Sequence, residues 1–160
     1  MNALSISLEE KIIEKINKDN LTKEESVELI EDLYWADWDL LNDKYMDQIP
    51  KIFSYLRNDD HSQEEVSQIL KLYNNPHGAY VDEFSDIIIE LYKRHRLKFI
   101  KSLNMEKDEM SNLVYLFRNN NVVIDQDVEL LDTIKSDRLS EEEKDTGRFL
   151  IKMYDNICNT

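Results

Sequence analysis

Glycine most limits how this chain can fold, because the 160-residue sequence contains only Gly78 and Gly147. Dinucleotide-binding loops, P-loops and nucleophile elbows each need several glycines at fixed spacings, so that the backbone can approach a phosphate or hold a tight turn. A β-sandwich with many short turns also needs more turn-forming residues than this chain has. The sequence therefore excludes these enzyme classes and predicts an all-α protein.

A repeated pattern, in which Ser or Thr is followed three residues later by Glu, marks the helix starts. In such a capping box the hydroxyl accepts a hydrogen bond from an amide of the first turn, while the carboxylate reaches back to the capping residue. Four copies precede apolar residues at helical spacing: Ser7/Glu10, Thr22/Glu25, Ser62/Glu65 and Ser140/Glu143. Because a chain of this length can bury one core, we predict a single all-helical domain over residues 1–160.

Short polar segments separate the predicted helices, among them Asp19-Asn20 and Asn119-Asn120-Asn121. Connections this brief join antiparallel neighbours. Pro50 interrupts an otherwise helical run, which predicts a kink or a new helix start between Tyr45 and Ile49.

An internal similarity joins Ile52–Asp59 and Leu113–Asn120, which share an apolar and aromatic helix end followed by Arg-Asn. Ile69–Asn75 is similar to both but lacks the arginine. Over residues 22–136 this pattern resembles the HEAT and armadillo class of α-α repeats. The resemblance implies antiparallel hairpins stacked as a right-handed superhelix, and it implies a protein-binding scaffold. The alternative is a compact helical bundle, which has similar helix ends.

Both tryptophans lie in one acidic segment, and we predict a partner-binding surface at Trp35, Asp37, Trp38, Asp39 and Asp43. Tryptophan is a frequent interface anchor, and carboxylates beside it suit a basic peptide or protein. On one unbroken helix Asp37 would fall on the apolar face, so we favour a break at which Asp37 caps the next helix. The alternative is that both tryptophans belong to the core.

The basic residues concentrate between Lys93 and Lys101, inside a chain whose formal net charge is -14. Arg94, Lys98 and Lys101 have the spacing of one helix face and are candidate anion-binding residues. The alternative is that they form ion pairs with acids within the fold. The overall charge repels nucleic acid and favours a basic partner.

The chain shows no motif for a metal, a cofactor or a catalytic group, and we predict none. His61 and His77 are weak candidates for loop metal sites, and His95 is expected in the core. No apolar run spans a bilayer and the N-terminus lacks a signal pattern, so we predict a cytoplasmic protein, unless an export signal has been removed. The bias toward Lys, Asn, Ile and Tyr follows AT-rich codons and indicates a low-GC bacterial or phage source.

Together these observations predict a non-catalytic acidic interaction module that binds a basic protein or peptide. By analogy with small acidic helical inhibitors of basic toxins, the role would be immunity-like. One alternative is a helical hydrolase or metal-dependent enzyme whose site the spacing does not reveal. Another is a structural domain of a larger bacterial assembly.

Overall fold

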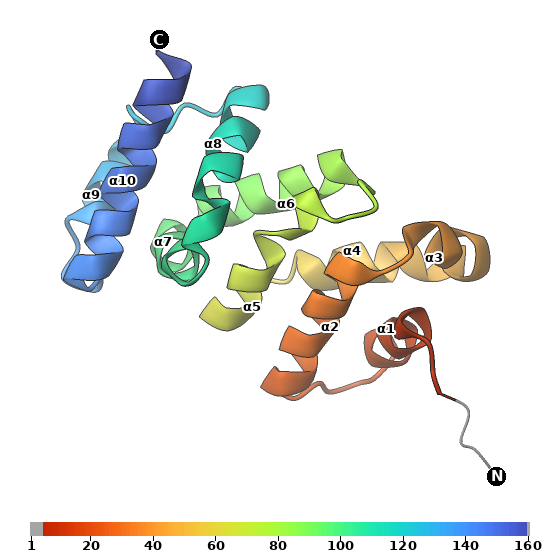
Figure 1. The fold of residues 1–160 in the computed structure, drawn as a ribbon. Helices are drawn as coiled ribbons and strands as arrows, with labels where there is room; N and C mark the ends of the chain where they lie inside the picture. The colour runs from red at the N-terminus through yellow and green to blue at the C-terminus, as the bar shows by residue number, and fades with distance from the viewer. Residues whose placement is uncertain (1–4, 160) are drawn as a thin grey trace. The chain divides into compact units, whose positions relative to one another are not determined.

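Every regular element between residues 5 and 159, the range that the structure describes, is a helix (Figure 1). The structure is a computed structural model, and it has ten α-helices and three short 3₁₀ helices in this range. The all-α prediction is confirmed. None of these helices combines the length and the hydrophobicity needed to cross a bilayer.

The chain divides into two compact units, one ending at Phe84 and the other beginning at Ser85. Both boundary residues lie inside one helix, α6, which therefore continues from the first unit into the second. The elements that begin in the first unit are α1 (Leu8–Ile16), α2 (Lys23–Trp35), α3 (Trp38–Tyr45), η1 (Met46–Gln48), α4 (Ile49–Leu56), α5 (Gln63–Ile69), η2 (Leu72–Asn74) and α6 (Val81–Arg94).

The predicted caps start the helices of the first unit. Thr22 and Ser62 form complete capping boxes with Glu25 and Glu65, and Ser7 accepts a hydrogen bond from the amide of Glu10. A new helix, α4, starts at Ile49, and Pro50 lies in its first turn. Amides of the first turn have no hydrogen-bond partner within the helix, so the missing N–H of proline costs no hydrogen bond there. The predicted helix start before Pro50 is confirmed.

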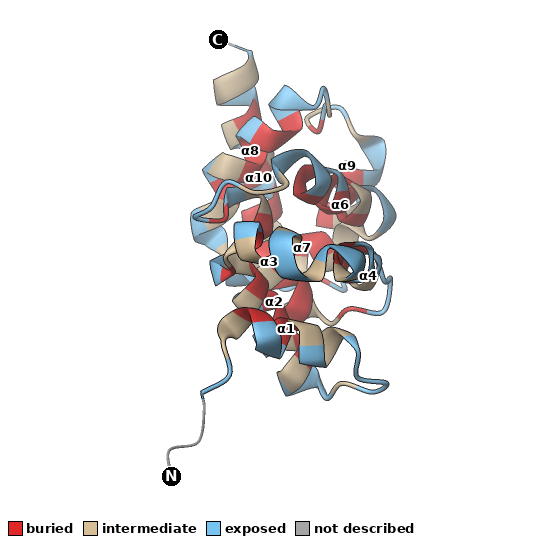
Figure 2. Cartoon of the chain, turned by 90° about the vertical axis from the view of Figure 1, so that its right-hand side faces the viewer, coloured by how far each residue is buried: buried red, intermediate tan, exposed pale blue. Residues whose placement is uncertain are grey.

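An aromatic cluster lies at the centre of the first unit. The indole ring of Trp38 packs edge-on against Tyr80 and Phe84, with ring centroids 5.4 and 5.6 Å apart. Phe53 contacts the same two rings at 5.1 and 5.6 Å. Figure 2 shows the buried residues on the sides of the helices that face their neighbours. These aromatic residues bury large apolar areas, so they fix how α3, α4 and the start of α6 pack.

The second unit contains the rest of α6 and four more α-helices. They are α7 (Arg96–Met105), α8 (Met110–Asn119), α9 (Val128–Ile134) and α10 (Glu141–Cys158), with η3 (Lys107–Glu109) before α8. The capping box of Ser140 and Glu143 starts α10. A second aromatic cluster, in which the ring of Tyr92 lies 5.3 Å from that of Phe99 and 5.0 Å from that of Phe117, joins α6, α7 and α8.

Gly147 allows α10 to approach α9 closely. A Cβ atom at this position would lie 2.7 Å from Cγ1 of Ile134, which is closer than packed carbon atoms approach. A larger residue would therefore require the side chain of Ile134 to move. One of the two glycines therefore serves helix packing.

Candidate functional site

Trp35 is the large aromatic side chain that the first unit leaves open to solvent, with 65% of its surface exposed. It is the last residue of α2, and its ring is held edge-on against Tyr34 with the centroids 4.9 Å apart. An exposed tryptophan already fixed by a neighbouring ring loses little side-chain freedom on binding. The structure thus leaves Trp35 exposed at the end of α2.

Trp38 is buried, which corrects its assignment to the predicted surface. Only 1% of it is exposed, and its indole N–H donates a hydrogen bond to the carbonyl oxygen of Leu33 at 3.2 Å. A side chain inside the aromatic cluster cannot touch a partner. The alternative prediction, that both tryptophans belong to the core, is therefore right for Trp38 and wrong for Trp35.

Asp37 lies in the break between α2 and α3, which separates the two tryptophans. Its Oδ1 accepts a hydrogen bond from the amide of Leu40 at 3.1 Å, which makes it the N-cap of α3. Its own amide donates to Glu9 Oε2 at 3.1 Å and so ties this break to α1. The predicted cap is confirmed, and because its carboxylate is used inside the fold, Asp37 is not a free contact residue.

Asp39 and Asp43 are exposed on α3, the helix after Trp35. Their spacing of four residues places both carboxylates on the same face of that helix. Both side chains are therefore open to solvent, and their role in binding stays a prediction.

Three exposed glutamates lie along α2 on the same side as Trp35. The sequence reasoning missed them. Glu24, Glu28, Glu31 and Trp35 are all exposed and have the spacing of one helix face. We call these four residues the α2 face. The sequence signal for this face is the spacing of the four residues, which places them on the side of α2 opposite to its buried residues.

The α2 face borders a shallow groove of about 350 Å³ between α2 and α5. Val27 supplies an apolar surface in it, and Glu64 faces the three glutamates from α5. Two of these glutamates form ion pairs with lysines. Lys15 lies 3.2 Å from Glu28, and Lys23 lies 3.0 Å from Glu64. The groove keeps an excess of carboxylates, since its lining holds four glutamates and one lysine.

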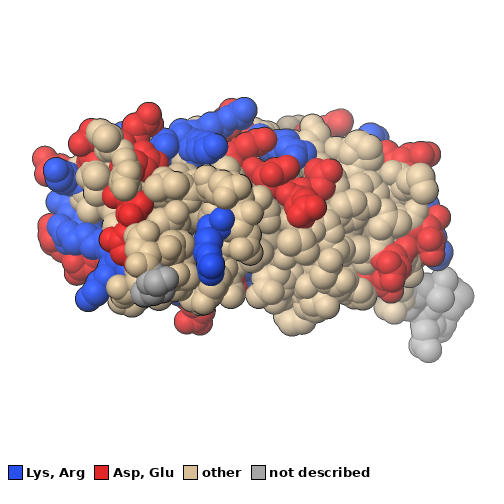
Figure 3. All heavy atoms as spheres, turned by 90° about the horizontal axis from the view of Figure 1, so that it is seen from above, with Lys and Arg blue, Asp and Glu red and all other residues tan. Residues whose placement is uncertain are grey.

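Charge is unevenly spread over the surface. On the face drawn in Figure 3, acidic and basic side chains lie next to one another in several groups, with wide areas of other residues between these groups. The net charge of -14 therefore does not produce one uniform acidic face on this side. A basic partner would be directed by local groups of carboxylates.

The predicted anion-binding face does not form, because the helix breaks at His95. Arg94 ends α6 and Arg96 begins α7, so Arg94 does not share a helix face with Lys98 and Lys101. Lys101 instead lies 3.2 Å from Glu143 Oε1 of α10. For Lys101 the alternative of an ion pair within the fold is correct.

Arg96, at the start of α7, has several defined partners, and the sequence reasoning did not single it out. Its guanidinium contacts Asp127 Oδ2 at 2.9 Å and Glu129 Oε2 at 2.8 Å, and it lies over the ring of Tyr92 at 4.9 Å. Burial raises the pKa of Asp127, but hydrogen bonds from Tyr92 and Arg96 outweigh it and lower the pKa overall. This cluster attaches the start of α9 to α6 and α7, which is a structural role.

His61 belongs to a buried polar cluster and not to a loop metal site. Its Nδ1 lies 2.6 Å from Glu65 Oε2, and its Nε2 lies 2.8 Å from the carbonyl oxygen of Tyr55. Ser26 Oγ donates to the same carboxylate oxygen at 2.6 Å and also bonds the hydroxyl of Tyr55. Both ring nitrogens of His61 therefore lie within hydrogen-bond distance of oxygen atoms of the fold.

The other two histidines, His77 and His95, also do not belong to a group of metal-binding side chains. His77 is exposed in the turn before α6, and His95 is half-buried at the junction of α6 and α7, not in the core as expected. Between residues 5 and 159, no three side chains of His, Cys, Asp or Glu converge so that they could hold a metal ion.

Comparisons of the chain with protein-family models, with curated proteins and with solved structures found no match.

Proposed function

We propose that this protein is a non-catalytic acidic interaction module that binds a basic protein or peptide through the α2 face. The proposal rests on the exposure of Trp35. This side chain is 65% exposed, and it lies on the same helix face as a row of exposed glutamates. Aromatic residues at the centre of an interface supply much of the binding free energy, and surrounding charges set orientation and association rate.

The carboxylates of the α2 face and of α3 have distinct roles in this proposal. Glu24 and Glu31 attract Lys or Arg side chains to the groove, where Val27 offers an apolar contact. Asp39 and Asp43, exposed on the next helix, extend the acidic surface beyond Trp35. Since exposed carboxylates act mainly through screened attraction, their effect weakens as salt shortens the Debye length to about 8 Å at physiological ionic strength.

The wider setting that we propose is a HEAT-like scaffold in the cytoplasm of a low-GC bacterium or its phage, with an immunity-like role toward a basic toxin. The basis for the scaffold is the repeated helix end at Ile52–Asp59 and Leu113–Asn120. The basis for the location is that these 160 residues include one cysteine, which can form no disulfide with another residue of the same chain.

The test is a calorimetric titration with a synthetic Lys- and Arg-rich peptide that carries one leucine. We expect the wild-type protein to bind it, and we expect Glu24→Lys/Glu31→Lys to weaken binding about tenfold or more, because like charges repel in the groove. Asp39→Lys/Asp43→Lys is expected to weaken it as well. Raising the salt concentration should reduce the wild-type affinity.

The matched control reverses two acids elsewhere. Asp82 and Asp86 are exposed four residues apart on α6, and Asp82→Lys/Asp86→Lys makes the same change in net charge. Equal weakening by this control and by Glu24→Lys/Glu31→Lys would contradict the proposal, because it would show attraction to net charge and not to the α2 face. Circular dichroism of each variant shows whether the helices are intact.

A further inference from the structure

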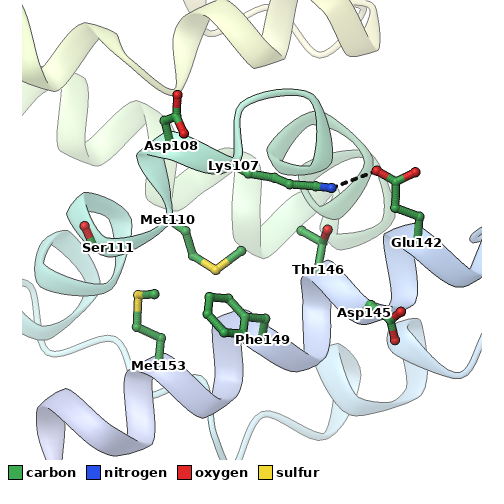
Figure 4. A pocket seen from close by; sticks show the side chains of 9 residues that line it. All are labelled: Lys107, Asp108, Met110, Ser111, Glu142, Asp145, Thr146, Phe149 and Met153. Carbon is green, nitrogen blue, oxygen red and sulfur yellow. Dashed lines mark hydrogen bonds and ion pairs between the residues drawn. The ribbon is translucent and has the colours of Figure 1, made fainter.

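The second unit has an open apolar groove that none of the features above explains. It lies between η3 and α8 on one side and α10 on the other, with a volume of about 490 Å³ (Figure 4). Met110, Phe149 and Met153 point toward one another in it. Met110 is 4% exposed and forms the floor, whereas Phe149 is 53% exposed.

α10 has two apolar faces, and only one of them is used for packing. Leu150 and Tyr154 are buried within the unit. Phe149 and Met153, four residues apart, lie on a second face that opens into the groove. A phenylalanine more than half exposed on a well-packed helix marks a surface suited to a partner.

Charge at one end of the groove indicates what kind of partner fits. Asp108, Glu142 and Asp145 line it together with Lys107, and Asp145 lies 2.8 Å from Arg148 Nη1, so three carboxylates meet two cations there. Lys107 lies 2.7 Å from Glu142, and this exposed ion pair connects η3 to α10 at that end (Figure 4). Exposed ion pairs contribute little free energy, so a cation of a partner can replace Lys107 at low cost.

We infer that this groove binds an amphipathic helix whose apolar side chains contact Met110, Phe149 and Met153 and whose Lys or Arg residues meet Asp108, Glu142 and Asp145. A helix fits between two neighbouring helices by placing residues at positions i, i+4 and i+7 in the groove. Methionine side chains adapt their shape and so accept apolar residues of different sizes. The groove therefore serves a second contact with a basic protein, separate from the α2 face.

The probe is a synthetic peptide of about 15 residues, close to the length at which isolated helices are marginally stable. It carries leucines along one helix face and lysines elsewhere, and its scrambled isomer has the same composition without the apolar face. Fluorescence anisotropy measures the affinity of both. We expect the scrambled isomer to bind about tenfold more weakly, because its charge is the same but its leucines cannot enter the groove together.

Three variants locate the binding. Phe149→Ser should weaken binding of the amphipathic peptide about tenfold, while Val128→Ser, which also removes an apolar side chain that is 67% exposed on α9, should leave it unchanged. In Trp35→Ala the tenfold preference for the amphipathic isomer over the scrambled one should persist, because this preference arises at the groove and Trp35 belongs to the α2 face in the first unit. Failure of the groove is thereby distinguishable from failure of the proposed function.

Several outcomes would overturn the inference: equal affinity of the two peptide isomers, unchanged binding by Phe149→Ser, or equal losses with Val128→Ser. A further outcome is a dimer in analytical ultracentrifugation that Phe149→Ser dissociates. In that case a second copy of this chain occupies the groove, and the inferred basic helix does not.

Discussion

At the scale of single residues, the carboxylate of Glu65 has the most demanding surroundings. It accepts hydrogen bonds from Ser26 Oγ and from the ring of His61, each at 2.6 Å, and from the amide of Ser62 at 3.1 Å. Burial alone would raise the pKa of Glu65, but these hydrogen bonds outweigh it and lower the pKa below its ordinary value of 4.5. The folded state therefore favours the ionised carboxylate.

The variant Glu65→Gln tests this arrangement. A lowered folded-state pKa contributes stability that is present above pH 4.5 and is lost as the pH falls through the folded-state pKa. Near neutral pH we expect Glu65→Gln to reduce the free energy of unfolding by about 1–3 kcal/mol. The difference from wild type should shrink below pH 4.5, as measured by urea denaturation over a series of pH values.

Glu10→Gln is the matched control, because Glu10 holds the corresponding position in the first turn of α1 but is exposed. It should change stability little at any of these pH values. A pH-independent difference for Glu65→Gln would show that packing, and not the charge of the carboxylate, accounts for the loss.

Single residues also show where sequence reasoning works. Asp37 could be predicted as a cap because a carboxylate on an apolar stripe conflicts with an unbroken helix. Trp35 and Trp38 could not be told apart, since both satisfy the local pattern and only the contacts of Trp38 with Tyr80 and Phe84 decide which one is buried. Burial of an aromatic residue depends on segments far along the chain.

At the scale of elements, the break between α2 and α3 determines that Trp35 is exposed and Trp38 is buried. Asp37→Ala removes the hydrogen bond to the amide of Leu40 and should reduce the free energy of unfolding by about 1 kcal/mol. Asp37→Asn keeps an oxygen that can accept this bond, and should be close to wild type. Chemical denaturation measures both, and equal losses would contradict the capping role.

The elements also explain why the anion-binding face was mispredicted. The spacing of Arg94, Lys98 and Lys101 suits one helix, but His95 separates two helices with no glycine or proline nearby to indicate it. The apolar residues of α10 show the same limit, because Phe149, Leu150 and Tyr154 all follow helical spacing, yet Phe149 is exposed and the other two are buried. Periodicity identifies a helix and its apolar residues, but a helix with two apolar faces buries only the one that finds a neighbour.

At the scale of the whole molecule, the chain is predicted to unfold as one domain although it divides into two compact units. The reason is that α6 continues through the boundary at Phe84 and Ser85, so unfolding of one unit disrupts a helix of the other. Both tryptophans lie in the first unit, whereas circular dichroism reports on all helices. We expect the two signals to change at the same urea concentration, and separate transitions would contradict a single domain.

The central claim is that a basic partner covers Trp35, and the fluorescence of that residue measures it most directly. Trp35 is 65% exposed and Trp38 is 1% exposed, so only the emission of Trp35 can respond to losing contact with water. Titration of the Lys- and Arg-rich peptide into the wild-type protein should shift the emission to shorter wavelength, and Trp35→Phe should abolish the shift. Binding of the peptide without a shift in the wild-type protein, or with an equal shift in Trp35→Phe, would contradict the claim.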